Sequence, residues 1–177
     1  MTRTRYSTAT TLDGFIATDD HSLDWLLSRE TGTMPGDFNF DTFLPQVGAV
    51  VMGASTYEWV LAHDAGWSYE QPTWVFTHRQ LEVPSGADVR FTQAPIPDVH
   101  AEMAESAAGK DIWLVGGGDL VGQFHDHGLL DEVIAAVAPV TIGSGKPLLP
   151  RHVELSLQEV AHSGEFACLR YDVIRPA

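Results

Sequence analysis

The sequence predicts an α/β protein whose sheet is mostly parallel and covered on both faces, and two observations support this class. Short unbroken apolar runs, such as Val47–Met52 and Ile112–Val115, alternate with segments of helical periodicity, as in parallel sheets packed between helices. Near the C-terminus, the strand-like segments Leu155–Val160 and Ala167–Ile174 are joined by the link 162–165, which is too short for a helical crossover. We therefore expect the sheet to end in an antiparallel C-terminal hairpin.

The remaining elements follow from periodicity and turn residues. A first strand within Arg3–Thr11 meets a turn at Asp13-Gly14 and partly resumes after it. The segment Thr18–Gly36 is polar and longer than most loops, so it is either a lid over a site or a surface loop. Further strands are expected at Thr73–Thr77, Val89–Thr92 and Glu132–Ile142, and helices at Phe38–Leu44, 55–61 and Asp98–Ala108.

Composition excludes several classes of function. A chain of 177 residues is long enough for a sizeable core, and we expect one domain over 1–177. No apolar run approaches the roughly 18 residues of a membrane span, and we see no signal peptide, so we expect a cytoplasmic protein without membrane contact. A formal net charge of −14 with only two lysines argues against nucleic-acid binding. The single cysteine, Cys168, excludes an internal disulfide and a cysteine-based zinc site, and no other metal site is expected, since His125 and His127 lie on different helix faces.

The segment Asp111–Val121 carries the strongest local signal for a ligand. Its apolar run ends abruptly in three glycines, Gly116 to Gly118, after which apolar residues recur at helical spacing. Residues without Cβ let a ligand approach the backbone, and a helix N-terminus offers free N–H groups and a positive dipole end, which together suit a diphosphate. The alternative is a tight structural turn. The dinucleotide fingerprint and the phosphate-loop motif are both incomplete, so we expect a nucleotide cofactor that is held in another way.

Four motifs occur in the order seen in the dihydrofolate reductase-like superfamily, namely Thr11–Ala17, Val50–Gly53 followed by Thr56-Tyr57-Glu58, Leu114–Gly118 and Pro139–Leu149. Together they resemble most closely the riboflavin-biosynthesis reductase domain, the RibD C-terminal family, and its small stand-alone members. The resemblance implies a three-layer α/β/α dihydrofolate reductase-like fold with a central sheet of about eight strands. It also implies an NADPH-dependent reductase.

The resemblance further implies which residues hold NADPH. Its diphosphate would lie on Gly116, Gly117, Gly118, Asp119 and Leu120, and the bond between the first two glycines would be cis. Ala17 and Ile16 would border the nicotinamide, and the loop from Thr18 onward would be the lid. The other implied cofactor residues are Gly53, Ser55, Thr56, Thr77, His78 and Arg79.

The choice between NADPH and NADH stays open in the sequence. Relatives often carry arginine at the position of Ala54, where it pairs with the adenosine 2′-phosphate of NADPH. Arg79 matches the other segment that reads this phosphate and offers a fork of donors. The alternative for Arg79 is a solvated surface arginine.

Asp37 is the expected catalytic carboxylate, because its type and its spacing from Gly53 match the substrate-binding acid of folate reductases. Asp41, one turn later, would share its face. The alternative for Asp37 is a helix N-cap. Besides Ile16, the expected substrate contacts are Asp24, Trp25 and Lys146. Trp25 could stack on a flat ring. The loop of Lys146 lies near substrate in the riboflavin-pathway relatives, and the alternative is that Lys146 only solvates a turn.

Three functions remain open at this point. The first is a reductase of a small flat nitrogen heterocycle, most like 5-amino-6-(5-phosphoribosylamino)uracil reductase, because the turn Leu12-Asp13-Gly14 and the loop Gly143–Leu148 look most like that enzyme. The second is a dihydrofolate or pteridine reductase. The third is a non-catalytic nucleotide-binding or dimeric module, with Glu132–Ile142 contributing to a homodimer. The cysteine pattern of the zinc deaminase that is often fused to the riboflavin-pathway enzyme is absent, so we expect reduction alone.

Overall fold

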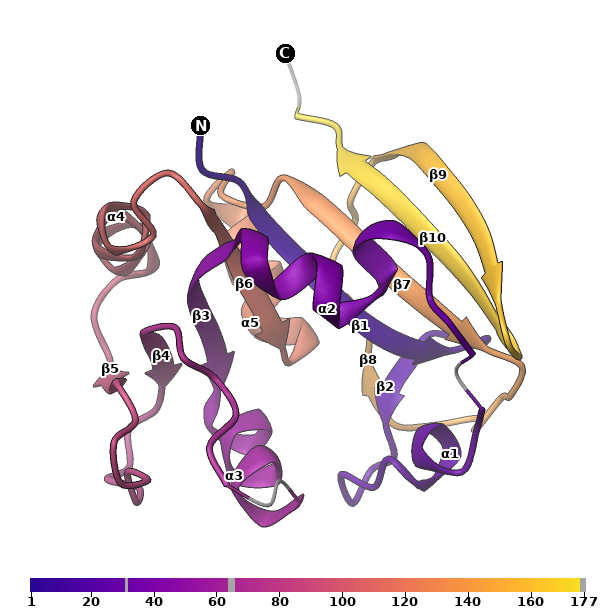
Figure 1. Cartoon of the computed structure of the whole chain (residues 1–177), viewed down its shortest axis with the longest axis horizontal. Coiled ribbons are helices and arrows are strands. Elements are labelled where there is room, and N and C mark those ends of the chain that lie inside the picture. Colours follow the sequence, from indigo (N-terminus) through magenta and orange to yellow (C-terminus); the bar gives the residue numbers. More distant parts are fainter. Residues whose placement is uncertain (31, 64–65, 176–177) are drawn as a thin grey trace.

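The chain forms an eight-stranded sheet, shown in Figure 1, in which six adjacent strands pair in parallel. The structure is a computed structural model that describes residues 1–30, 32–63 and 66–175. The strand order is β5 (Val89–Thr92), β4 (Thr73–Phe76), β3 (Val47–Gly53), β6 (Asp111–Gly116), β1 (Thr4–Thr11), β7 (Glu132–Ala138), β10 (Phe166–Val173) and β9 (Leu155–Ser163). Strand β10 is antiparallel to both β7 and β9. The predicted mostly parallel sheet with an antiparallel C-terminal hairpin is therefore confirmed.

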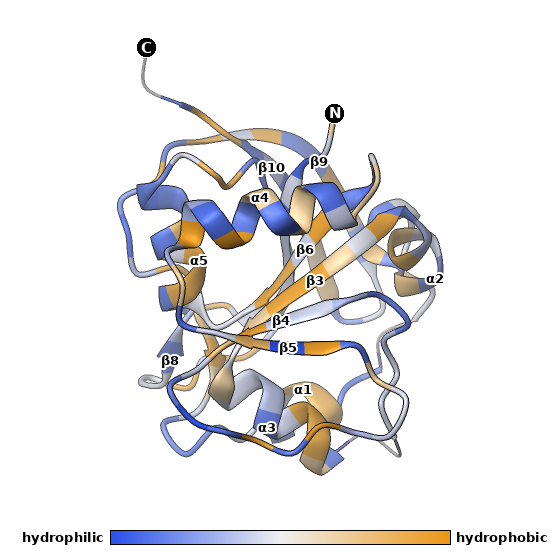
Figure 2. Cartoon of the chain, turned by 90° about the vertical axis from the view of Figure 1, so that its left-hand side faces the viewer, coloured by the Kyte–Doolittle hydropathy of each residue, from blue (hydrophilic) through white to orange (hydrophobic). Residues whose placement is uncertain are grey.

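Helices cover both faces of this sheet and give the molecule three layers. Helices α4 (Ile96–Ser106) and α5 (Gly118–Asp126) pack on one face, and α2 (Phe40–Phe43) and α3 (Ala54–His63) on the other (Figures 1 and 2). In β3, Val51 packs with residues of α4 and α5, whereas Val50 packs with Phe43 and Tyr57. Both valines are fully buried, which explains why the strand is an unbroken apolar run. Among the described residues, no helix is long and apolar enough to cross a membrane.

The face that carries α2 is covered by short helical pieces and not by the single helix expected over Phe38–Leu44. A 3₁₀ turn, η1 (Gly36–Phe38), precedes α2, and a second one, η2 (Leu44–Gln46), follows it. The side chain of Asn39 accepts a hydrogen bond from the Asp41 amide at 2.8 Å, so Asn39 caps α2. The prediction of Asp37 as a helix N-cap is therefore wrong.

A small second sheet pairs β2 (Phe15–Ala17) with β8 (Lys146–Pro147) and places Lys146 opposite Ala17. Asp13 links the loops that carry the two strands, because its carboxylate accepts hydrogen bonds from the amides of Ile142 and Gly143 at 3.1 and 2.8 Å. The hydrogen bonds from the Thr11 hydroxyl and from these two amides lower the pKa of Asp13. The turn residue Asp13 thus fixes the position of Lys146 relative to β2.

Strand β7 ends at Ala138 and not at the expected Ile142, and it lies between β1 and β10. Its backbone groups are paired on both sides, so this strand offers no free edge for a second copy of the chain. The edges of the large sheet are β5 and β9. Strand β7 therefore cannot pair with a second copy, and the contribution of Glu132–Ile142 to a homodimer stays a prediction.

Candidate cofactor and substrate site

A cavity of about 1320 Å³ opens at the carboxyl ends of the parallel strands, which is where open α/β sheets bind ligands. Helices α1 (Asp24–Leu27) and α3 both lie at this end of the molecule, apart from each other (Figure 1). The cavity is lined in part by residues of α1, η1 and α2. Its volume exceeds the roughly 300–1,000 Å³ of ordinary small-ligand pockets, so it has room for a dinucleotide and a second ligand.

The structure brings most of the expected site residues together around this cavity. The expected residues that line it are Ile16, Ala17, Gly53, Ser55, Thr56, Thr77, His78, Gly117, Gly118, Asp119, Leu120 and Lys146. They come from the ends of β3, β4 and β6, from the first turns of α3 and α5, and from the small sheet. Residues of the expected lid also line it, among them Leu23, Leu26 and Met34, while Thr31 lies outside the described residues.

The glycine turn after β6 presents the N-terminus of α5 to the cavity. The expected cis peptide bond between Gly116 and Gly117 is present. The first helical hydrogen bond runs from the Val121 amide to the Gly117 carbonyl at 3.2 Å, so the amides of the three preceding residues have no acceptor within the helix. A Cβ added at Gly117 would meet no atom within 4 Å, which leaves open space next to these amides. This combination of free donors, dipole end and space fits a diphosphate.

On the other side of the glycine turn, the ends of β3 and β4 form a second wall. Gly53 ends β3, and an added Cβ there would lie 3.9 Å from the Gly116 carbonyl oxygen and the Gly117 nitrogen. Ser55 and Thr56 lie in the first turn of α3, and Thr77 directly follows β4. These hydroxyl groups surround the part of the cavity that is farthest from the small sheet.

The rest of the cavity is an apolar chamber over the middle of the sheet. Trp113, Val115, Ile134 and Ala136 form its floor, and its roof is formed by residues of α1, η1 and α2 together with Met34. The Trp113 ring lies 5.4 Å from the Phe40 ring, centroid to centroid, and its indole nitrogen donates to the Ser7 carbonyl at 3.2 Å. Because these two rings contact each other, a flat ligand ring would lie beside the pair, against the other apolar residues of the chamber.

The cavity is basic although the protein is strongly acidic. Asp119 is the only acidic residue among the described residues that line it, and it is paired with Arg151 at 3.2 Å. Arg29, Lys146 and three histidines line it as well. Arg29 is paired with Glu165 at 3.1 Å, whereas no ion pair in the described part of the chain involves Lys146. This charge distribution favours neutral or anionic ligands.

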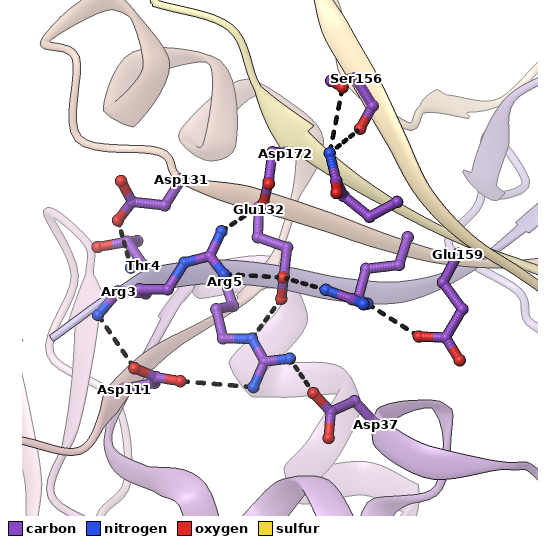
Figure 3. A network of polar contacts seen from close by, with 12 residues as sticks. Arg3, Thr4, Arg5, Asp37, Asp111, Asp131, Glu132, Ser156, Glu159 and Asp172 are labelled. Carbon is purple, nitrogen blue, oxygen red and sulfur yellow. Dashed lines mark hydrogen bonds and ion pairs between the residues drawn. The ribbon is translucent and has the colours of Figure 1, made fainter. Parts of the chain in front are cut away.

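Asp37, the expected catalytic acid, does not reach the cavity. Its carboxylate pairs with the Arg5 guanidinium at 2.5 Å and accepts a hydrogen bond from Gln46 at 2.7 Å. Figure 3 shows Arg5 surrounded by Asp37, Glu132 and Asp111. Burial opposes ionisation of Asp37, but the hydrogen bonds from Gln46 and Arg5 outweigh it and lower the pKa of Asp37. The expected role of Asp37 as a substrate-binding acid does not fit this position, because η1 turns the side chain toward β1.

Three other expected residues also lie away from the cavity lining. Asp41 is exposed in α2, and Asp24 is exposed in the first turn of α1. Trp25 is buried in a cluster with Phe166 and Cys168, where its indole nitrogen has no hydrogen-bond partner. The single turn of α1 points Trp25 into this cluster, so we no longer expect it to stack on the substrate.

Three further residues line the cavity that were not expected from the sequence, namely Arg29, Phe38 and Phe40. Phe38 and Phe40 flank the polar residue Asn39, and this alternation of aromatic and polar residues could have indicated that both phenylalanines line a cavity. Arg29 had no such signal, because its position depends on its own ion pair with Glu165 in the C-terminal hairpin. Arg79, which was expected to read the adenosine 2′-phosphate, lies in a groove beside the main cavity.

Comparison with known proteins agrees with this geometry. A family model described as RibD C-terminal domain matches residues 4–169. The uncharacterized protein YwjB of Bacillus subtilis (strain 168) is 34% identical over 167 residues, which cover 92% of this chain and 93% of YwjB. A solved structure from Shewanella sp. PV-4, whose name refers to riboflavin biosynthesis, is 26% identical with a TM-score of 0.82 and covers 99% of this chain and 100% of its own.

The dihydrofolate reductase of Enterococcus faecalis is 14% identical with a TM-score of 0.59, over 97% of this chain and 96% of its own. At this identity the likeness shows the fold alone, and it confirms the predicted dihydrofolate reductase-like architecture. The family model spans nearly the whole chain, and YwjB is similar over almost its full length. The chain therefore belongs to the RibD C-terminal domain family, which is a family of reductases.

Proposed function

We propose that this protein is an NADPH-dependent reductase of a small, flat nitrogen heterocycle, most like 5-amino-6-(5-phosphoribosylamino)uracil reductase. The observation that carries the proposal is the continuous cavity that joins the N-terminus of α5 to the apolar chamber. Such a cavity supports a diphosphate-bearing cofactor beside a flat substrate. Holding two reactants in adjacent positions is the main contribution that a protein makes to hydride transfer.

The residues present fit NADPH at three places. The amides of Gly118, Asp119 and Leu120 would bind the diphosphate, Ile16 and Ala17 would border the nicotinamide, and the hydroxyl groups of the α3 side would surround the adenosine. When bound, NADPH supplies the hydride. The apolar walls of the chamber would exclude water from the ring that is reduced.

Lys146 would orient the substrate from the edge of the chamber. It lies opposite Ala17 across the small sheet, and no carboxylate among the described residues pairs with it. Its ammonium group would therefore be free to donate hydrogen bonds to a ring carbonyl or to a phosphate. The Asp13 link between the two loops would keep this donor beside the nicotinamide position.

The charges favour a phosphorylated pyrimidinone over a dihydropterin. Folate reductases resemble this chain in carrying an acid at the position of Asp37, but here that carboxylate is paired with Arg5. The one acidic residue in the described lining, Asp119, lies at the cofactor end. Arg29 and Lys146 provide positive charge for an anionic substituent. A non-catalytic module is the weaker alternative, because it would not need an open chamber beside the cofactor site.

The first test is a titration of NADPH and of NADH, read by energy transfer from tryptophan to the dihydronicotinamide. Trp59 and Trp113 line the cavity, so bound cofactor would accept their emission. We expect binding at micromolar concentrations and oxidation of NADPH on addition of a phosphoribosyl pyrimidinone, but slower oxidation with dihydrofolate. Failure of both nucleotides to bind at millimolar concentration would overturn the reductase proposal.

The chain offers a matched pair for the substrate side, because its two lysines are Lys146 and Lys110. Lys146→Gln should raise the KM for the phosphorylated substrate about tenfold through loss of a charged hydrogen bond, with an unchanged Kd for NADPH. Lys110→Gln removes the same charge outside the cavity lining and should leave both constants unchanged. Equal effects of the two substitutions would contradict the role of Lys146.

A further inference from the structure

A fork of two hydrogen bonds joins Arg79, which lies two residues beyond Thr77, to Glu58 in α3. Its Nη1 donates to Glu58 Oε1 at 2.9 Å and its Nη2 donates to Glu58 Oε2 at 2.7 Å. The Arg79 amide donates to the Thr77 hydroxyl at 3.0 Å, which fixes the turn that carries the arginine. The side chains of Arg79 and Glu58 are 55% and 44% exposed, so a ligand has access to the pair.

This pair lies beside the end of the cavity where the adenosine of a dinucleotide would be. Arg79 lines a groove of about 580 Å³ that shares Thr77, His78, Thr92 and Gln93 with the main cavity. A dinucleotide with its diphosphate at α5 and its nicotinamide at the small sheet would extend its adenosine toward this groove. The groove is therefore in the right place for the 2′-phosphate, the only group that distinguishes NADPH from NADH.

Arg79 is the only arginine or lysine among the described residues that line the groove. His78 lies beside it, with its Nδ1 3.0 Å from Gln93 Oε1. The neighbouring positions in α3, Ala54 and Ser55, carry no charge. A phosphate that used the Arg79 fork would have to displace the Glu58 carboxylate and would then face its negative charge. Arginine forks bind carboxylate and phosphate with the same geometry, so the two groups compete.

We propose that Glu58 sets the cofactor preference of this protein by occupying the Arg79 guanidinium and opposing the 2′-phosphate of NADPH. The inference rests on the proposed function, since it concerns the cofactor of the same site. The wild-type protein therefore prefers NADPH over NADH less strongly than it would with an uncharged residue at position 58. A neutral residue at position 58 frees the arginine for phosphate and makes the protein selective for NADPH. Glu58 acts through Arg79 and is a positioning residue.

The test measures the Kd of NADPH and of NADH for the wild type, Glu58→Gln, Arg79→Ala and the double variant. Glutamine keeps the size and one acceptor oxygen of glutamate but removes the charge. We expect Glu58→Gln to lower the Kd of NADPH about two- to fivefold, as for an exposed charge contact, and to leave the Kd of NADH unchanged. In the Arg79→Ala background the same substitution should have a much smaller effect on NADPH.

Glu105→Gln is the control, because Glu105 is exposed near the end of α4 and its substitution changes the net charge by the same amount. This variant should leave the ratio of the two Kd values at the wild-type value. An unchanged ratio in Glu58→Gln, or an equal gain with Arg79 absent, would overturn the inference while nucleotide binding itself still supports the reductase proposal. Absence of binding of either nucleotide to any variant would overturn both.

Discussion

Gly118, the first residue of α5, offers the sharpest test of how the cofactor site is built. An ideal Cβ at this position would lie 2.5 Å from the Leu148 carbonyl oxygen and closer still to that of Pro147. These are backbone atoms of β8 and the residue after it, so rotation of a side chain cannot relieve the contact. Gly118→Ala would therefore push the helix N-terminus and β8 apart.

The size of the effect follows from the contacts around Leu148. Its carbonyl oxygen must move by roughly 1 Å to reach ordinary van der Waals distance. This oxygen accepts a hydrogen bond at 3.0 Å from Tyr6, a fully buried residue. Overpacking and a weakened buried hydrogen bond together cost about 2–4 kcal/mol, equivalent to a fall in Tm of roughly 5–15 °C.

The assay is thermal unfolding of the purified protein, paired with the Kd of NADPH. Gly118→Ala should show the lower Tm and at least about tenfold weaker NADPH binding, because the free amides of α5 move away from the diphosphate position. Gly122→Ala in the same helix is the control. The three atoms nearest to its Cβ all belong to the Arg151 side chain, the first at 2.8 Å, so a side-chain shift can relieve the contact, and the changes in Tm and Kd should be smaller than for Gly118→Ala. Wild-type values for Gly118→Ala would refute the reasoning.

Two further predictions concern buried charge. Asp37→Asn should lower the free energy of unfolding by about 1–3 kcal/mol, because it leaves Arg5 with one carboxylate fewer in a buried network, but it should not change the Kd of NADPH; a weakened Kd with unchanged stability would return Asp37 to the site. Burial lowers the pKa of His100, so the folded state binds the proton less readily than the unfolded state. The neutral form of His100 therefore contributes its full stabilisation above the ordinary pKa of about 6.5. This stabilisation is lost as the pH falls from there toward the folded-state pKa. In His100→Gln the fall in Tm between pH 7.5 and pH 5.5, measured by calorimetry, should be smaller than in the wild type, and an equal fall would contradict this assignment.

The glycine turn was predictable because its signal is contiguous in the sequence. An apolar run of four residues, three glycines and a helical pattern follow one another within the segment Asp111–Val121. Strand, turn and helix start are all fixed by local propensity, and the structure places them as β6, the turn and α5. The binding role of the turn stays a proposal, because a tight structural turn has the same residues.

The errors have a common physical cause, which is contact between segments far apart in the chain. Asp37 has the right residue type and spacing for a substrate-binding acid, but spacing does not say which way a side chain points. The direction is set by Arg5, a buried arginine on β1 that pairs with Asp37 at 2.5 Å. Strand β8 has only two residues, too few for any periodicity, and it forms because the loop after β7 is tied to Asp13.

The net charge of −14 and a site for anionic ligands are compatible because charge acts over different distances. At physiological ionic strength the Debye length is about 8 Å, so most of the acidic surface is screened from a ligand inside the cavity. The affinity for a phosphate then depends on the few groups within hydrogen-bond reach. In this protein the proposed groups are the α5 amides, Lys146, Arg29 and Arg79. Two of the three cations are already paired with glutamates, Arg29 with Glu165 and Arg79 with Glu58. Removing one of these glutamates should therefore change the charge available to a ligand in the same direction as adding a cation, which is the reasoning behind the Glu58→Gln test.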